Sequence, residues 1–259
     1  MHGYRALLFM DNEDESLMLR ALADGSIDGA IVTSSRLDSR LPASLIAHHV
    51  PVVLVNRYVD GLDIDSCVVD NVEGARQIAA HVLDLGHREI GIVAGPLSSS
   101  TARDRMRGFT AAFTAAGVVV PSSRVRHSAF TFERGRTEMA SLIEADPRIT
   151  AVLCGNNVLA LGALEAAEAA GMLVPSQMTI TGYDDMPIAS WSRVDLTTVR
   201  QDVDGLGREG ARLLIDRLQS DATRSRRVVL APLLVERGTT ARPRVNMINR
   251  TIDNASVCM

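Results

Sequence analysis

The sequence contains no lysine, because all 27 of its basic residues are arginine. Schiff-base chemistry, attachment of pyridoxal phosphate and a Walker A phosphate loop all require a lysine amine, so those classes are excluded. Aromatic residues are also scarce, at 3%, and 31 acidic residues give a net charge of −4. A chain of this charge lacks the concentrated positive surface that wraps nucleic acid. Any DNA binding is therefore expected to depend on residues outside this sequence.

Cysteine and long apolar runs are also sparse. Cys67, Cys154 and Cys258 are far apart and show no CxxC or Cys/His spacing, which predicts a reducing compartment with neither a disulfide framework nor zinc. The six histidines form no HExxH or other metal-ligand motif. No apolar run approaches the roughly 20 residues of a membrane span, and residues 6–10 are too short for a signal-peptide core. We therefore expect a cytoplasmic protein without a metal, a cofactor or a membrane partner.

Short β-branched runs alternate with amphipathic stretches along nearly the whole chain. This rhythm predicts parallel βαβ units, and hence the α/β class. The expected strands cover residues 5–10, 27–33, 51–56, 66–69, 89–94, 124–129, 151–154, 178–181, 197–200 and 227–235. The expected helices cover residues 13–23, 42–49, 72–85, 102–116, 133–145, 158–170 and 205–218. The last strand carries Pro232, which favours a bulge or an edge position.

One motif resembles a dinucleotide site but has a simpler interpretation. Residues 205–210 read GLGREG, a literal GxGxxG between a short strand and a helix. The dinucleotide fingerprint has an acid about 20 residues on, at the end of the next strand, whereas the strand at 227–235 has no acid before Glu236. We favour small residues that pack a helix over an oxidoreductase. Because the sequence carries neither GxSxG nor another nucleophile motif, we expect a protein that is not an enzyme.

Polar residues follow several expected strands at their carboxyl ends, the edge that carries the ligand crevice in a doubly wound sheet. Arg103 comes early in the helix after the loop 95–101, which suits either a ligand rich in oxygen atoms or simple N-capping. Asn156 follows one strand, and Asp184 and Asp185 follow another. Adjacent residues of an extended segment point in opposite directions. We therefore do not expect the two aspartates to form a catalytic pair.

Several segments carry a more specific pattern in their order and spacing. They are VVLVNR at 52–57, VDN at 69–71, LGHREI at 85–90, GPLSSSTARDRMRGF at 95–109, TGYDD at 181–185, LTTVRQ at 196–201 and ERGTT at 236–240. Together they resemble the effector-binding core of the LacI/GalR family of transcriptional regulators. The resemblance covers essentially residues 3–243.

The resemblance implies a fold of two Rossmann-like lobes with parallel sheets, of the periplasmic-binding-protein-like type I, with a small-molecule effector in the cleft between them. It also implies a homodimer and an effector that is a carbohydrate or another small polar metabolite. On this basis the N-terminal lobe comprises residues 1–68 and 202–223, the C-terminal lobe residues 69–201 and 224–243, and the tail residues 244–259.

The family's effector contacts can be carried over by position. They fall on Asn56, Asp70, Arg103, Phe130, Asn156, Asp184 and Gln201. A guanidinium such as Arg103 and a carboxylate such as Asp184 can each form two hydrogen bonds with a polyol. Phe130 is either a stacking partner for a sugar or an ordinary core residue, and Trp191 is a second aromatic candidate. Asn157 stands where the family commonly has aspartate, which makes the expected site less acidic.

The family usually begins with a helix-turn-helix and a hinge helix, which have no counterpart in this sequence. Residues 3–10 resemble the family's second core strand, so the family's first core strand and its helix also have no counterpart in this sequence. We therefore expect a fragment of a longer repressor or a remnant of low stability. The predicted function is the effector-sensing part of a regulator that reaches operator DNA only through a missing N-terminal domain. Ligand would shift an equilibrium between open and closed lobes.

The alternative is a freestanding sugar-binding receptor of the transport type, which the absence of a signal peptide opposes.

Overall fold

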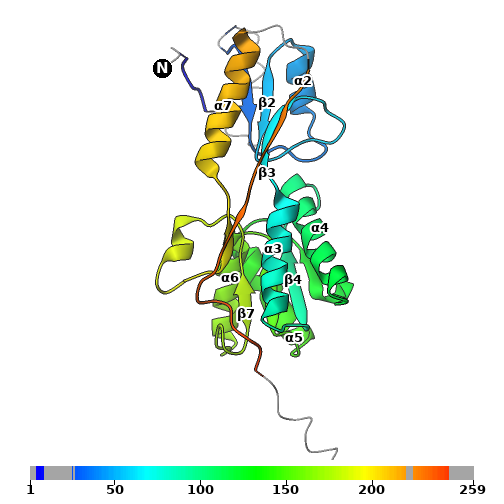
Figure 1. The fold of residues 1–259 in the computed structure, drawn as a ribbon, viewed down its shortest axis with the longest axis vertical. Helices are drawn as coiled ribbons and strands as arrows, with labels where there is room; N and C mark the ends of the chain where they lie inside the picture. The colour runs from blue at the N-terminus through cyan, green and yellow to red at the C-terminus, as the bar shows by residue number, and fades with distance from the viewer. Residues whose placement is uncertain (1–3, 9–24, 26, 220–223, 245–259) are drawn as a thin grey trace, which may run out of the picture. The chain divides into compact units, whose positions relative to one another are not determined.

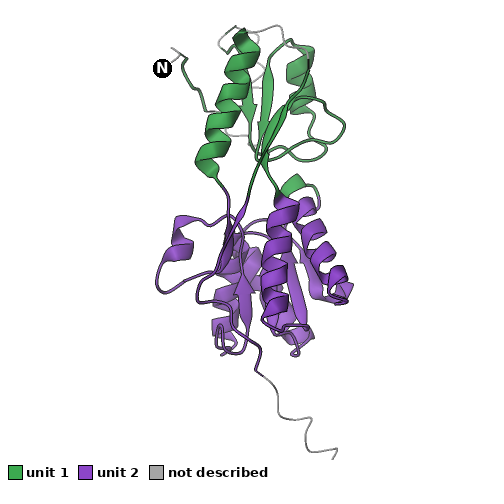
Figure 2. Ribbon diagram, in the orientation of Figure 1, with its two compact units in different colours: residues 1–70, 98–101, 202–231 green, residues 71–97, 102–201, 232–259 purple. Residues whose placement is uncertain are grey.

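The computed structural model describes residues 4–8, 25, 27–219 and 224–244 (Figure 1). The chain divides into two compact units (Figure 2). Unit 1 contains residues 1–70, 98–101 and 202–231, and unit 2 contains residues 71–97, 102–201 and 232–259. Each unit is built on a four-stranded parallel sheet, so the α/β class predicted from the alternating pattern is confirmed.

Unit 1 has the strand order β1 (Ala30–Val32), β2 (Val52–Val55), β3 (Asp65–Val69) and β9 (Arg227–Leu230). Every residue of β2 is buried, and alternate side chains serve opposite faces of the sheet. Val52 and Leu54 pack with α2 (Leu41–Ala47), whereas Val53 and Val55 pack with α7 (Val203–Gln219). The uninterrupted apolar run of β2 is thus that of a strand covered on both faces.

The GLGREG hexapeptide lies inside α7 rather than in a loop before it. The Gly205 N–H donates to Asp202 Oδ1 (2.7 Å), and Gly210 packs so closely on Val55 that a Cβ there would overlap its side chain. N–H groups used in this way cannot cradle a pyrophosphate. The interpretation of small residues that pack a helix is confirmed, and nothing in the placement favours a dinucleotide.

Unit 2 has the strand order β5 (Val125–His127), β4 (Ile90–Ala94), β6 (Ala151–Cys154) and β7 (Thr179–Thr181). One face of the sheet packs on α3 (Asn71–Asp84) and α4 (Ser100–Ala115), and the other on α5 (Phe132–Ala145) and α6 (Asn157–Ala169) (Figure 1). The chain runs from β4 to β5 and then returns to place β6 on the opposite side of β4. The strand order therefore reverses between β4 and β6, a topological switch point of the kind that binds ligands in doubly wound sheets.

The single strand expected at 227–235 is wrong, because the structure has two strands there. β9 joins the sheet of unit 1, whereas β10 (Leu233–Val235) pairs with β8 (Thr198–Arg200) in an antiparallel ladder of unit 2. Pro232 stands between them, and its lack of an N–H explains why one ladder cannot continue through it. Residues 224–231 consequently lie in unit 1, although the sequence placed them with the second lobe.

Two further expectations concern the N-terminal segment. Residues 5–8 have no regular secondary structure, so that part of the strand expected at 5–10 is wrong. Residues 9–10 and the helix expected at 13–23 lie outside the described residues. The other expected elements are present, with ends shifted by a few residues in most cases. None of the helices in the described part of the chain is long and apolar enough to cross a bilayer.

The contact between α5 and α6 depends on two glycines. A Cβ on Gly162 would overlap the carbonyl oxygen of Phe132 and lie 2.6 Å from Arg136 N, and a Cβ on Gly135 would overlap the carbonyl oxygen of Leu159. We expect Gly162→Ala to lower the free energy of unfolding by about 1–3 kcal/mol, because the two helix backbones must move apart. Urea unfolding followed by far-UV circular dichroism measures this change.

Gly207→Ala is the matched control, since Gly207 is also inside a helix but a Cβ there meets no atom within 4 Å. Alanine is the better helix former by about 1 kcal/mol, so this variant is expected to be as stable as the wild type or slightly more stable. A Gly162→Ala protein that matches the wild type would contradict the close packing of α5 on α6.

Candidate functional site

The loops that follow β4 and β6 meet at the switch point of unit 2. Gly155, directly after β6, approaches Gly95, after β4, so closely that a Cβ on Gly155 would lie 2.9 Å from Gly95 N. The Gly155 N–H donates to the Val93 carbonyl (2.7 Å). Only glycine permits this approach of two backbones. The carbonyl of Gly155 is left to accept from a side chain of α4.

That side chain is Arg105, whose guanidinium is only 4% exposed. Its Nη1 donates to the Gly155 carbonyl (2.6 Å), and its Nε donates to Asn71 Oδ1 (2.8 Å). Its Nη2 donates to Asp184 Oδ1 (2.9 Å). The guanidinium also lies over the ring of Tyr183, 3.7 Å from its centroid. Arg105 thereby joins the start of α3, the end of β6 and the loop after β7.

Asp184 receives a second donor from the segment after β8. Gln201 Nε2 donates to the same Oδ1 at 2.6 Å, and the Asp184 N–H donates to the Val199 carbonyl (2.8 Å). The φ of Asp184 is 100°, a conformation that costs an L-residue free energy and persists only where the surroundings enforce it. The carboxylate is 25% exposed. It is therefore fixed in place and accessible to a solute.

The neighbouring Asp185 has different partners. Its carboxylate, 5% exposed, pairs with Arg200 (2.6 Å) and Arg237 (2.7 Å). Its φ is 53°, so both aspartates are left-handed and the extended backbone expected from the sequence is wrong. The two carboxylates nevertheless bind different groups. Asp185 anchors the loop to β8 and to the C-terminal segment. Asp184 is therefore the carboxylate of the candidate site.

Three other predicted residues lie in unit 2. Asn156 caps α6, since its Oδ1 accepts from the Leu159 N–H (2.9 Å). Phe130 is half-buried and packs over Gly95, where a Cβ would overlap its ring. Trp191 follows the short helix η2 (Pro187–Ser190) and is 62% exposed. Asn156 and Phe130 thus stand at the strand ends, whereas Trp191 belongs to a surface loop.

Asn56 and Asp70 belong to unit 1, where they follow β2 and β3. The Asn56 N–H donates to the Cys67 carbonyl (2.8 Å), and the residue is left-handed, with a φ of 68°. Its buried Oδ1 accepts no hydrogen bond from the described residues. The Asp70 N–H donates to the Leu230 carbonyl (3.0 Å). Both residues therefore mark the carboxyl edge of the unit 1 sheet, the edge that binds ligands in this class.

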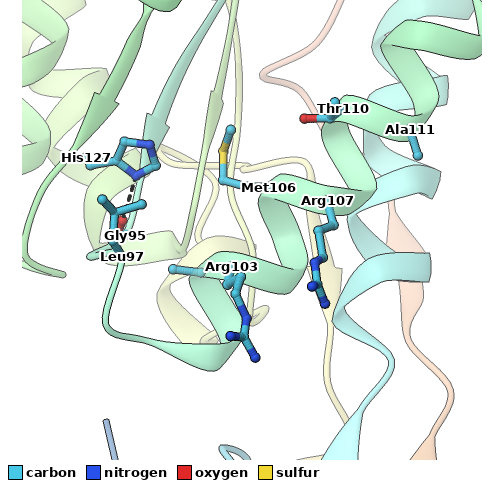
Figure 3. Close-up of a pocket in the computed structure, with 9 residues that line it drawn as sticks. Gly95, Leu97, Arg103, Met106, Arg107, Thr110, Ala111 and His127 are labelled. Carbon is cyan, nitrogen blue, oxygen red and sulfur yellow. Dashed lines mark hydrogen bonds between the residues drawn. The ribbon is translucent and has the colours of Figure 1, made fainter. Parts of the chain in front are cut away.

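Arg103 lies on a different face of α4 from Arg105. Arg105 is in helical phase with the buried Phe109, whereas Arg103 is in phase with Met106 and Arg107 and lines a surface pocket with them (Figure 3). The arginine bonded to the Asp184 carboxylate is Arg105, which was not among the contacts expected from the sequence. The apolar periodicity of α4 could have identified Arg105, because it falls on the buried face.

The chemistry of this cluster is that of polar recognition. A guanidinium and a carboxylate, from Arg105 and Asp184, are in direct contact, and the amides of Asn71 and Gln201 adjoin them. These groups donate and accept hydrogen bonds but supply no activated nucleophile. Within the described residues, no group of three or more His, Cys, Asp and Glu side chains is arranged to hold a metal ion.

Known proteins resemble this chain in sequence. Residues 79–240 match the family model of a periplasmic binding protein-like domain. The HTH-type transcriptional repressor PurR of Escherichia coli O1:K1 is 32% identical over 244 residues, which cover 92% of this chain and 72% of the repressor.

Solved structures resemble the fold. The transcriptional regulator CelR, in its complex with cellobiose, gives a TM-score of 0.84 at 31% identity and covers 88% of this chain and 71% of its own. A LacI family transcriptional regulator from Enterococcus faecium with bound ribose gives a TM-score of 0.78 at 26% identity, over 92% and 87% of the two chains.

Proposed function

The chain belongs to the LacI family of transcriptional regulators, and we propose that it is the effector-sensing part of such a regulator. It binds a carbohydrate or a similar small polar metabolite and catalyses no reaction. Ligand binding shifts the equilibrium between open and closed lobes of a homodimer, and thereby the affinity of an attached DNA-binding domain for its operator. The family relationship supports this proposal, as do the cellobiose and ribose bound by two similar regulators.

The observation that carries the proposal is the Asp184 carboxylate, held by Arg105 and Gln201 at the switch point of unit 2. A carboxylate fixed in this way accepts hydrogen bonds from hydroxyl groups without first having to be ordered. Because the charge of Arg105 balances that of Asp184, the cluster suits a neutral polyol better than a strongly charged ligand.

The remaining contacts are assigned by the family resemblance. In this proposal, the resemblance adds Asn56, Asp70, Arg103, Phe130, Asn156 and Gln201 to Arg105 and Asp184. Trp191 is included as a second aromatic candidate. Phe130 offers its ring to a sugar face, and the asparagines and Gln201 offer amides to hydroxyl groups.

A thermal-shift panel of mono- and disaccharides that includes ribose and cellobiose tests the proposal. At 100 times its Kd, a ligand stabilises the folded chain by about 2.7 kcal/mol, which raises Tm measurably. We expect Asp184→Asn to weaken the best binder of the panel by at least tenfold, because a hydrogen bond to a charged group is worth about 1.5–3 kcal/mol. Isothermal titration calorimetry measures the affinity.

Asp84→Asn is the matched control, because Asp84 is exposed at the end of α3 in the same unit. Its affinity for the sugar is expected to equal that of the wild type. Equal affinities for Asp184→Asn and Asp84→Asn would remove Asp184 from the site, and a panel without any binder would refute a carbohydrate effector.

A further inference from the structure

We propose a second ligand site in unit 2, on the outer face of α4, which takes a small organic anion with an apolar body. The site is a surface pocket of about 530 Å³ (Figure 3). It is lined by Gly95, Leu97, Ala102, Arg103, Met106, Arg107, Thr110, Ala111 and His127. The volume lies within the range of small-molecule sites, roughly 300–1,000 Å³. Arg103 is shared with the proposed effector contacts, but Arg105, which leaves α4 on its buried face, and Asp184 do not line the pocket.

The floor of the pocket is apolar. Ala102, Met106 and Ala111 come from α4, and Leu97 of the loop after β4 adds a side chain that is 70% exposed. The Met106 side chain extends from α4 on the side of the pocket where His127 lies (Figure 3). A methionine adapts its shape to different apolar surfaces. These groups favour an aromatic or branched aliphatic body over a polyol.

The rim of the pocket is cationic. Arg103 and Arg107, one turn apart, extend toward the same side of α4 (Figure 3). Arg107 is 63% exposed, and its pair with Asp104 is long, at 3.4 Å, so an incoming anion competes with a weak contact. None of the lining residues is acidic. A carboxylate on the ligand would therefore meet guanidinium donors in a geometry that arginine binds well.

His127 closes the pocket on the side of β5. Its Nδ1 donates to the Gly95 carbonyl (3.2 Å), because a carbonyl oxygen can only accept. The ring is thereby tied to the loop after β4, which holds that wall of the pocket in place. The apolar floor and the cationic rim thus belong to three segments of one unit, namely α4, the loop after β4 and the end of β5.

Methyl NMR of the full chain labelled with ¹³C-methyl methionine tests this proposal, with Met106→Leu used to assign the Met106 signal. The probe is 4-isopropylbenzoate, and its controls are 4-isopropylbenzamide, which keeps the body without the charge, and acetate, which keeps the charge without the body. We expect the benzoate to shift the Met106 methyl signal saturably. The benzamide is expected to bind at least tenfold more weakly, and acetate to cause no shift at equal concentration.

Arg107→Gln is expected to weaken binding of the benzoate by at least threefold, whereas Arg193→Gln, which changes an exposed arginine elsewhere in unit 2, is expected to leave it unchanged. The proposal is overturned if the Met106 signal does not move, if the benzamide binds as well as the benzoate, or if the two glutamine variants behave alike. An equal shift with acetate would reduce the pocket to a simple anion site. The sugar site is tested separately by Asp184→Asn, because Asp184 does not line the pocket.

Discussion

Replacement of Arg105 with methionine is expected to lower the free energy of unfolding of unit 2 by about 3–5 kcal/mol, the cost of removing one partner from a buried charged network. Methionine fills part of the space but donates no hydrogen bond. The variant therefore leaves Asn71 Oδ1, the Gly155 carbonyl and the Asp184 carboxylate without their contacts to the guanidinium. Trp191 is the only tryptophan of the chain and lies in unit 2, so its fluorescence reports this unfolding directly.

The same variant is expected to lose sugar binding. Without Arg105, Asp184 keeps Gln201 but loses the donor that sets its orientation, so its left-handed backbone is less firmly held. Arg107→Met is the control, because Arg107 is on the same helix but 63% exposed. It is expected to retain the stability and the sugar affinity of the wild type. If Arg105→Met and Arg107→Met unfold at the same urea concentration, Arg105 does not hold the strand ends together.

Asp65 is a buried carboxylate of unit 1. Asp65→Asn is expected to lower the free energy of unfolding of unit 1 by about 3 kcal/mol at pH 7. The Asp65 side chain is fully buried at the start of β3 and pairs with Arg217 (2.8 Å) and Arg226 (3.1 Å). It also accepts from the Arg226 N–H (2.6 Å). Asparagine cannot satisfy two guanidinium groups. Pulsed alkylation of Cys67, which is buried in the same strand, measures the opening of unit 1 across a urea series.

The pH dependence of Asp65 follows from its surroundings. Burial raises the pKa of the carboxyl, but the hydrogen bonds from Arg217 and Arg226 outweigh burial and hold that pKa below its usual value. A depressed pKa means that the stabilisation is complete above the unfolded value of about 3.9 and is lost as the pH falls through the folded pKa. The difference in Tm between wild type and Asp65→Asn should therefore be large at pH 7 and smaller at pH 3.

Asp28→Asn is the control for this pair of measurements, since Asp28 is an exposed residue of the same unit. It is expected to have the Tm of the wild type at both pH values. A difference between wild type and Asp65→Asn that stays constant from pH 7 to pH 3 would contradict a lowered pKa for Asp65.

Most of the fold could be predicted because hydrophobic patterning and local stop signals determine it. The strand expected at 151–154 has those bounds in the structure, since its apolar residues are buried on both sides of a parallel sheet. The division of 227–235 into two strands could not be predicted in the same way. It depends on which sheet each half joins, and the sequence around Pro232 shows only that a ladder is interrupted there.

The candidate site was predicted in part. Asp184, Gln201 and Asn156 follow expected strands, so the sheet edge could be identified from their positions alone. Arg105 could have been chosen over Arg103 as the partner of Asp184 from the sequence, because the apolar periodicity of α4 places Arg105 on the buried face of the helix. The roles of Asn71 and Tyr183 could not be found, because their contacts with Arg105 join segments that are distant in the chain. The left-handed backbone of Asp184 likewise depends on tertiary contacts.

Hydrogen–deuterium exchange with and without the carbohydrate that raises Tm most tests whether the sugar binds at the strand ends of unit 2. We expect slower exchange in the peptides that contain Asn71, Gly155, Asp184 and Gln201, because a bound polyol would fix these strand ends. Peptides from the exposed end of α3 around Asp84 should be unaffected. Protection that spares the loops after β6 and β7 would contradict the assignment of the site.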